Sequence, residues 1–246
     1  MYKRQAPAIP EFLQNSFDRI EFTSACHTDH PPVRWNQELK SEVALFLDHD
    51  LLCFDDLNGV AEFSEQNNSI VAMIAIENHF EISDWELIFD LCGVKFPSLL
   101  FQTKDGKLCP RYFNFGMVAC PKNHYDTIGP NLKSKIEVLT EYAVEHNHKY
   151  MLQHTGQLSL SVTIEEFGIP TIPLPIRYNF PNIQDSHLRF DNEFERLKVM
   201  HLMSSKNKFD SKKKLSQFLN TYTKNPIDLK LKKLFRRLGY SAVSLL

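Results

Sequence analysis

Asp48 and Asp50 are the first residues in this sequence whose spacing suggests chemistry. They follow the apolar run Val43 to Leu47, which has the length and composition of a buried strand. Alternate side chains of an extended chain share a face, so we expect the two carboxylates to point the same way. Ligands collect at the carboxyl ends of parallel strands, and carboxylates without a nearby thiolate suit Mg²⁺ or Mn²⁺. The pair therefore predicts a divalent-metal site, with a solvated turn or a helix cap as the alternative.

Five further residues could contribute to a binding site, and each also has a structural interpretation. His201, within Val-Met-His-Leu-Met, is a candidate metal ligand or a buried core histidine. Asn114 and Gly116 lie in a strand-like segment, where a glycine indicates either strand geometry or the close approach of a ligand. Arg34 could pair with a diphosphate or form a surface salt bridge. Gln157 could bind a ligand or lie on a solvent-facing helix surface.

Strands and helices alternate along the part of the chain that contains these residues. Apolar runs predict strands at residues 43–47, 69–76, 113–120, 169–174 and 198–203. A short helix is expected after Asp56, and another from Ser83, where Ser83 and Glu86 form a capping box and Gly93 can end the helix. Residues 132–146 have the apolar spacing of an amphipathic helix. This alternation predicts an α/β fold.

The composition excludes several classes of protein. The chain has 246 residues, of which 43% are hydrophobic and 24% are charged, with 8 Gly and 13 Pro. These values fit one sizeable core and exclude collagen-like and disordered chains. No apolar run approaches the roughly 18 residues that a membrane-spanning helix needs, and no signal peptide precedes the first strand. We therefore expect a cytoplasmic protein.

Several segments of the sequence resemble those of a known family and occur in the same order. The strand with its Asp-x-Asp pair is similar to that of GT-A glycosyltransferases, and Tyr112 to Met117 resembles the Phe-Asn-x-Gly strand of the glycogenin-like and galactosyltransferase-like members. Gly156 and Gln157 stand where those enzymes have an Asp-Gln pair that opens a helix. Leu174 to Asn179 resembles their Leu-Pro-x-x-Tyr/Trp-Asn segment, and His201 matches their late metal-binding histidine. The resemblance covers residues 34–209.

The resemblance implies a fold and a domain organisation. We expect a GT-A, Rossmann-like, mixed and mainly parallel sheet flanked by helices. Leu158, Leu160, Val162 and Ile164 alternate with polar residues as in a strand, but the family order and their i,i+4 pairs favour a helix. Residues 1–5 resemble a sequencing remnant, and residues 6–205 are expected to form the catalytic domain, with its first nucleotide-binding strand missing.

Residues 206–246 are expected to form a basic helical extension. The stretch from Met203 to Arg237 contains 11 Lys and Arg but only two Asp. Two amphipathic helices are predicted there, from Ser211 and from Asn225 to Gly239. Their lysines could simply be solvated, or they could contact an anionic membrane surface at its inner face. Because the remaining chain is acidic, a nucleic-acid partner is not expected.

The resemblance also implies a reaction, the transfer of a hexose from a nucleoside-diphosphate sugar to an unknown glycan or lipid-linked acceptor. Mn²⁺ or Mg²⁺ would be held by Asp48, Asp50 and His201 and would stabilise the leaving diphosphate. Gln157 is the residue to which the resemblance gives a catalytic role. The donor would be bound by Arg34, Asp48, Asn114, Gly116, Gln157, Lys206 and Lys208.

Departures from the family pattern leave two alternatives open. Gly156 replaces the family's Asp, and Ser204 replaces the Gly that usually follows the histidine. One alternative is a nucleotidyltransferase, which uses the same fold and strand-end carboxylates on a nucleoside triphosphate. The other is a degenerate member that binds a glycan or a partner without turnover.

Overall fold

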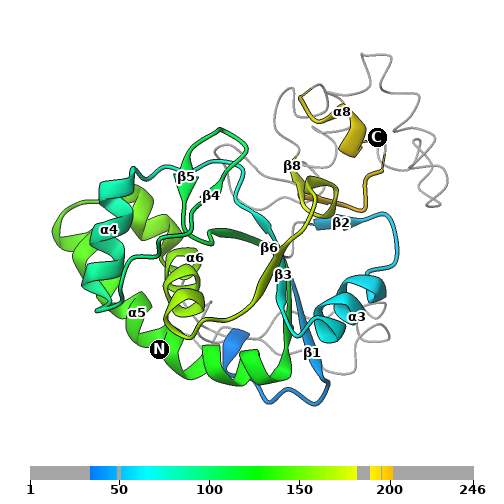
Figure 1. Cartoon of the computed structure of the whole chain (residues 1–246), viewed down its shortest axis with the longest axis horizontal. Coiled ribbons are helices and arrows are strands. Elements are labelled where there is room, and N and C mark those ends of the chain that lie inside the picture. Colours follow the sequence, from blue (N-terminus) through cyan, green and yellow to red (C-terminus); the bar gives the residue numbers. More distant parts are fainter. Residues whose placement is uncertain (1–33, 49–50, 182–188, 195, 202–246) are drawn as a thin grey trace, which may run out of the picture.

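The protein was analysed as a computed structural model, which describes residues 34–48, 51–181, 189–194 and 196–201. These residues form a mixed α/β structure in which a central sheet lies between helices (Figure 1). The α/β fold with helices flanking a sheet, predicted from the alternating patterns, is confirmed. The predicted helices from Ser211 and from Asn225 lie outside the described residues, as do residues 1–5, so the predicted domain boundaries remain predictions.

Nine strands and five helices, with one short 3₁₀ helix, are found in the described residues. The strands are β1 (Val43–Leu47), β2 (Leu51–Cys53), β3 (Ile70–Ile74), β4 (Phe101–Gln102), β5 (Leu108–Cys109), β6 (Phe113–Pro121), β7 (Thr171–Pro173), β8 (Phe180–Pro181) and β9 (Val199–His201). The helices are α3 (Asn58–Gln66), α4 (Ile82–Leu91), α5 (Lys122–Glu145), α6 (Lys149–Glu166), η1 (Ile176–Tyr178) and α8 (Asp191–Phe194).

The central sheet has the strand order β1-β6-β3-β7, and β6 runs antiparallel to both of its neighbours. Only β3 and β7 are parallel within it. A smaller sheet has the order β2-β9-β8, in which β2 and β9 are antiparallel. The expectation of a mainly parallel sheet is therefore wrong for the described strands. The cause is β6, since a long central strand buried on both faces reads as continuously apolar in either orientation.

The two faces of the central sheet carry different sets of side chains. In β3, Ile70 and Ala72 pack with residues of α5 and α6, whereas Val71 packs with Val60 of α3 on the opposite face. This is the alternation that a strand buried on both sides requires. Figure 1 shows the result, with α4, α5 and α6 on one side of the sheet and α3 on the other.

A second apolar core joins α4 to α5 and α6. Trp85 and Phe89 of α4 are fully buried against Leu139 of α5 and Leu158 of α6. Their i,i+4 spacing places both side chains on the same face of the helix. Each of these helices thus has one apolar face that is removed from water by its neighbours.

Residues 158–164 are helical, as predicted, within α6. All seven of them are buried, including Ser159 and Thr163. The helix lies between the sheet and the other two helices, so no side of this stretch faces water (Figure 1). Thr163 Oγ1 donates to the Ser159 carbonyl at 2.7 Å, which satisfies one of the buried hydroxyls. The alternating pattern reflects burial on all sides rather than an extended chain.

Two helix starts differ from the sequence predictions. Helix α4 is capped by Glu81 and not by Ser83, because Glu81 and Asp84 form the capping box. The Glu81 N–H donates to Asp84 Oδ2 at 2.8 Å. Helix α5 begins at Lys122 and continues through Pro130. The apolar side chains on both sides of this proline are buried, so packing outweighs its helix-breaking cost of about 3 kcal/mol.

Candidate functional site

The segment Asn114 to Gly116 forms an irregularity in β6. Ala72 of β3 pairs with Val118, but Ile74 pairs with Phe113 where a regular ladder would give Gly116. The intervening residues of β6 therefore leave the ladder with β3. On its other edge β6 remains regular, and the Asp48 N–H donates to the Gly116 carbonyl at 2.9 Å. Such bulges re-aim side chains, and they are common next to active sites.

Two asparagines meet inside this bulge. Asn114 Oδ1 accepts a hydrogen bond from the Gly116 N–H at 2.8 Å and a second from Asn179 Nδ2 at 2.7 Å. Asn179 follows the 3₁₀ turn η1, directly before β8, and is 1% exposed. The contact ties the bulge of the central sheet to the smaller sheet.

The His201 side chain packs against Gly116. A Cβ atom built on Gly116 would lie 2.8 Å from His201 Nδ1, 2.5 Å from Asn179 Oδ1 and 2.7 Å from Asn179 Nδ2. All three distances are shorter than real Cβ contacts, so only glycine fits between these side chains. His201 is 9% exposed and ends β9, where its partners are Leu51 in β2 and Pro181 in β8.

Asp48 and Arg34 form an ion pair at the end of β1. The Arg34 Nη2 atom lies 2.7 Å from Asp48 Oδ1, and both side chains are 23% exposed. Since the Asp48 backbone is bonded to Gly116, the carboxylate, the arginine, the bulge and the histidine belong to one region. This region brings together residues that are predicted to act together and that are far apart in the sequence.

Helix α5 holds the segment that carries Arg34. The Tyr125 hydroxyl lies 3.0 Å from the Arg34 carbonyl and 2.8 Å from the Gln37 carbonyl, and it accepts from the Gln37 N–H at 2.8 Å. One turn later, a Cβ on Gly129 would lie 2.1 Å from the Trp35 carbonyl oxygen. Tyr125 and Gly129 thus form a docking face for the chain around Arg34.

Of the remaining predicted site residues, only Gln157 is among those that the structure describes. Asp50, Lys206 and Lys208 lie outside the described residues, although Leu51, which follows Asp50 in the chain, is the ladder partner of His201. Gln157 is half-buried within α6. Gly156 and Gln157 do not open a helix as the resemblance implied, because α6 already begins at Lys149.

Metal binding by the described residues alone is not indicated. Within residues 34–48, 51–181, 189–194 and 196–201, no group of three or more His, Cys, Asp and Glu side chains lies close enough to hold an ion. Asp48 and His201 are described, whereas the third predicted ligand, Asp50, is outside these ranges. The predicted ligand set stays a prediction.

Asn179 is a site residue that the sequence analysis missed. It lies in the Leu174 to Asn179 segment that carries the family resemblance, which implies no separate role for it. The available signal was an asparagine between apolar neighbours, Tyr178 and Phe180. A buried amide needs hydrogen-bonding partners, so such a position favours a specific polar contact.

A group of aromatic and histidine rings lies beside the start of β6. The rings of Tyr112 and His154 meet edge to face with centroids 6.5 Å apart, and the His79 ring lies 5.8 Å from that of His154. Burial, assisted by His79, lowers the pKa of His154 from 6.5 to about 4. His154 is therefore neutral at physiological pH.

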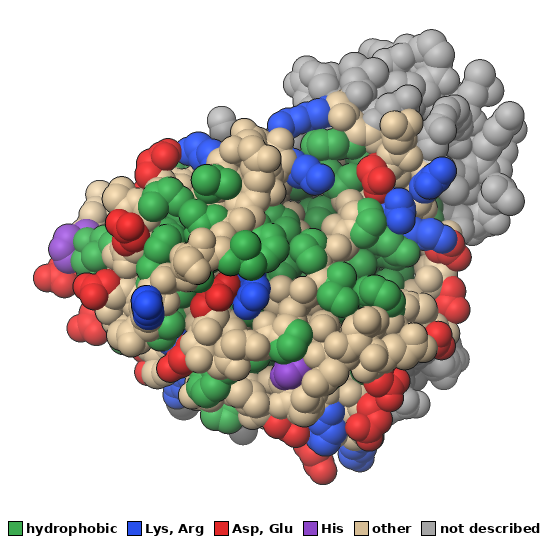
Figure 2. Space-filling view, viewed as in Figure 1, with side chains coloured by type: hydrophobic (Ala, Val, Ile, Leu, Met, Phe, Trp, Pro, Cys, Tyr) green, Lys and Arg blue, Asp and Glu red, His purple; other side chains and the backbone are tan. Residues whose placement is uncertain are grey.

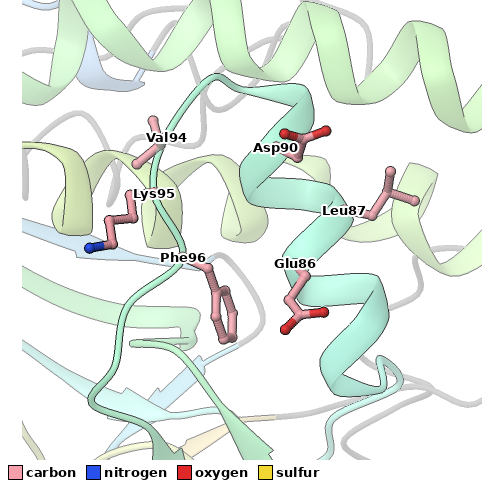
Figure 3. A pocket seen from close by; sticks show the side chains of 6 residues that line it. All are labelled: Glu86, Leu87, Asp90, Val94, Lys95 and Phe96. Atoms are coloured by element: carbon pink, nitrogen blue, oxygen red, sulfur yellow. The ribbon is translucent and has the colours of Figure 1, made fainter.

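The surface shows a separate hollow away from the predicted residues. A shallow pocket of about 450 Å³ is lined by Glu86, Leu87, Asp90, Val94, Lys95 and Phe96 (Figure 3). Its residues come from α4 and the chain that follows it, and none of them was predicted to bind a ligand. Figure 2 shows hydrophobic side chains across the middle of one face, with acidic and basic side chains mostly towards its margins. None of the described helices is long and apolar enough to cross a membrane.

The solved structures to which this chain is similar include two of LgtC and one of WbbM. A crystal structure of galactosyltransferase LgtC in complex with donor and acceptor sugar analogues is 18% identical, with a TM-score of 0.38, and the match covers 71% of this chain and 57% of that one. An active-site mutant of LgtC is 15% identical, with a TM-score of 0.38 and coverages of 77% and 65%. The apo structure of WbbM, a bifunctional glycosyltransferase, is 14% identical, with a TM-score of 0.40 and coverages of 88% and 38%. This chain therefore spans less than two thirds of the length of each.

A comparison with curated protein sequences gave no match. Comparison with protein families gave a match to the Rhodobacterales glycosyltransferase domain over residues 34–168. This range is more than half of the chain, and it contains Arg34, Asp48 and the bulge at Asn114 to Gly116. The sequence resemblance to glycosyltransferases is confirmed by it. Over residues 34–168, the chain belongs to the Rhodobacterales glycosyltransferase domain family.

Proposed function

We propose that this protein is a metal-dependent glycosyltransferase that transfers a hexose from a nucleoside-diphosphate sugar to a glycan or lipid-linked acceptor. The observation that carries the proposal is the convergence on Gly116. Asp48 bonds to this residue through the backbone, and His201 and Asn179 leave no room for a side chain there. The absence of a side chain at Gly116 lets these polar side chains come together at the bulge, where a ligand would meet them as one group.

The donor atoms in this region fit a divalent cation. Asp48 supplies a carboxylate, and His201 supplies an imidazole nitrogen beside Gly116. Asp50 would supply a second carboxylate, and carboxylate ligands suit Mn²⁺ or Mg²⁺. When bound, the ion would supply Lewis-acid stabilisation of the negative charge that develops on the diphosphate.

The chain's own residues would then bind and orient the donor. Arg34 places a guanidinium within 2.7 Å of Asp48, so it adds positive charge where a diphosphate would lie next to the metal ligands. Asn114 would hydrogen-bond the sugar from the bulge, and Gly116 would leave space for the His201 and Asn179 side chains beside it. Gln157, Lys206 and Lys208 remain proposed donor-binding residues on the family resemblance alone.

Thermal denaturation with and without ligands tests the metal and nucleotide parts of the proposal. Mn²⁺ together with UDP or GDP should raise the thermal midpoint, because a ligand that binds only the native state stabilises it. Asp50→Asn should remove most of this shift. His201→Ala should reduce it, because the variant lacks one of the proposed ligands. An unchanged midpoint for the unsubstituted protein would contradict the metal assignment.

Donor turnover separates the proposal from its alternatives. The protein should hydrolyse at least one of a panel of nucleoside-diphosphate hexoses slowly in Mn²⁺, with water in place of the acceptor. A nucleotidyltransferase would instead release pyrophosphate from a nucleoside triphosphate in the presence of a sugar phosphate. Binding of Mn²⁺ and nucleotide without either reaction would indicate a degenerate member of the family.

A further inference from the structure

We infer that Asn179 is a positioning residue that fixes the carboxamide of Asn114 with its oxygen inward and its nitrogen towards the ligand. The inference rests on the proposed function for the identity of the ligand, but its geometric part stands on the described hydrogen bonds. Asn179 lies outside the family match, which ends at residue 168.

The orientation of Asn114 is set by a backbone group. The Gly116 N–H can only donate, so the side-chain atom of Asn114 that lies 2.8 Å from it must be the oxygen. The two ends of an asparagine amide are otherwise hard to tell apart, but an obligate donor removes the ambiguity. Asn114 Oδ1 therefore points into the bulge.

The orientation of Asn179 follows from that of Asn114. The same oxygen lies 2.7 Å from the Asn179 amide, so Asn179 must present its nitrogen to it. Within the described part of the chain, Asn179 Oδ1 is then left buried with no hydrogen-bond partner, beside Gly116. An unpaired buried oxygen is unfavourable, so the Asn114 contact is made at a cost to Asn179. This cost argues that the contact serves more than local folding.

The consequence for Asn114 is a free donor. Its side chain is half-buried, and its Nδ2 atom makes no hydrogen bond in the described part of the chain and is not among the buried unpaired atoms. Two accepted hydrogen bonds prevent the amide from rotating to present its oxygen instead. The bulge therefore offers an N–H donor, which selects a ligand oxygen such as a sugar hydroxyl.

Two substitutions separate the inward contacts of Asn114 from its outward donor. Asn114→Asp keeps an oxygen that can accept from Gly116 and Asn179, but it replaces the outward nitrogen by a carboxylate oxygen. Its thermal midpoint should stay near that of the unsubstituted protein, while its affinity for UDP-galactose in Mn²⁺ should fall about tenfold or more. Affinity for UDP, which lacks the sugar, should change much less.

Asn179→Asp removes the inward donor and should act through Asn114. Its carboxylate faces Asn114 Oδ1, so the Asn114 amide must rotate or move away, and the Gly116 N–H loses its partner. Both the thermal midpoint and the affinity for UDP-galactose should fall, again with a smaller effect on UDP. Asn123→Asp, on the exposed surface of α5, is the matched control for the same chemical change and should leave both quantities unaltered.

Hydrogen exchange of the side-chain amides tests the positioning without a ligand. In protein labelled with ¹⁵N-asparagine, the Asn179 amide protons should exchange slowly and those of Asn114 quickly. If no nucleotide binds to the unsubstituted protein, the proposed function fails, and this exchange pattern still decides the inference. Equal exchange rates for the two amides would overturn it, as would a UDP-galactose affinity that Asn114→Asp leaves unchanged.

Discussion

The core between α4, α5 and α6 and the region around Gly116 are organised differently. The core consists of apolar side chains such as Trp85 and Leu139, which are fully buried and can be exchanged for similar shapes at moderate cost. The Gly116 region is held by directional contacts, including the hydrogen bond between Asn114 and Asn179, which are 65 residues apart. One region tolerates exchanges between apolar side chains of similar volume, and the other tolerates almost no substitution.

The difference predicts that stability and ligand binding can be changed independently. The helical core consists of buried apolar side chains, so substitutions there should act mainly on the free energy of unfolding. The Gly116 region is small and polar, so substitutions there should act mainly on affinity. The predictions below test this separation.

Trp85→Ala should have the largest effect on stability. The side chain is fully buried, and its Nε1 donates to Asn78 Oδ1 at 3.3 Å. Its removal should lower the free energy of unfolding by about 3 to 5 kcal/mol, because a large cavity is left. Chemical denaturation measures the change. The fraction that remains folded should bind Mn²⁺ and UDP normally, and a parallel loss of affinity would contradict the separation.

Gly116→Ala should weaken ligand binding more than other substitutions that add a single methyl group. Its Cβ would lie 2.5 Å from Asn179 Oδ1 and 2.8 Å from His201 Nδ1, so both side chains must move. We expect the affinity for UDP in Mn²⁺ to fall by about 100-fold and the free energy of unfolding to fall by about 1 to 3 kcal/mol.

Gly59→Ala is the matched control, because a Cβ there meets no atom within 4 Å. It should leave affinity unchanged and stabilise α3 by up to about 1 kcal/mol. Isothermal titration calorimetry compares the two variants. Similar affinities would show that the close packing of Asn179 and His201 against Gly116 is not required for binding.

Acidification should destabilise the protein through His154. Its pKa is lowered by burial to about 4, so the unfolded chain binds more protons than the folded one between about pH 6.5 and pH 4. The contribution of this group to the free energy of unfolding is present above pH 6.5 and is lost as the pH falls towards 4. The loss should amount to about 2 to 3 kcal/mol. His154→Gln should flatten this part of the stability profile measured by denaturation, and an unchanged slope would contradict the assignment.

Arg34→Met should have the smallest effect on stability and a moderate one on binding. The ion pair with Asp48 is partly exposed, and such pairs contribute less than about 1 kcal/mol. Affinity for UDP in Mn²⁺ should fall by about 3- to 10-fold if Arg34 contacts the diphosphate. Lys133→Met, which removes the exposed ion pair with Glu137, is the control and should not change affinity.

The sequence predicts the described elements better than the contacts between them. Apolar runs locate β1, β3 and β6, because burial on both faces requires continuous apolar residues. The direction of β6 could not be predicted, since neither burial nor period depends on strand direction. The helical state of residues 158–164 needed the family order, because their period of two is typical of a strand.

The candidate site could be predicted in part. Asp48, Asn114 and Gly116 stand out through their motifs, and the structure brings them together with Arg34 and His201. The partner of Asn179 could not be identified, because the contact spans 65 residues and depends on which end of an amide faces inward. The predicted capping box at Ser83 and Glu86 is wrong for a related reason. Several residues near the start of α4 could accept a hydrogen bond, and only the backbone conformation determines that Glu81 and Asp84 form the box.

Gly129 has a consequence for how sequence variation in this protein should be interpreted. It lies on α5, where glycine costs about 1 kcal/mol of helix stability relative to alanine, and the Trp35 backbone occupies the space that a methyl group would need. Replacement by alanine is favourable in an isolated helix, but here it would displace the segment that carries Arg34. In a genetic screen for lost activity, Gly129 would score as an active-site position although its own atoms never meet the substrate.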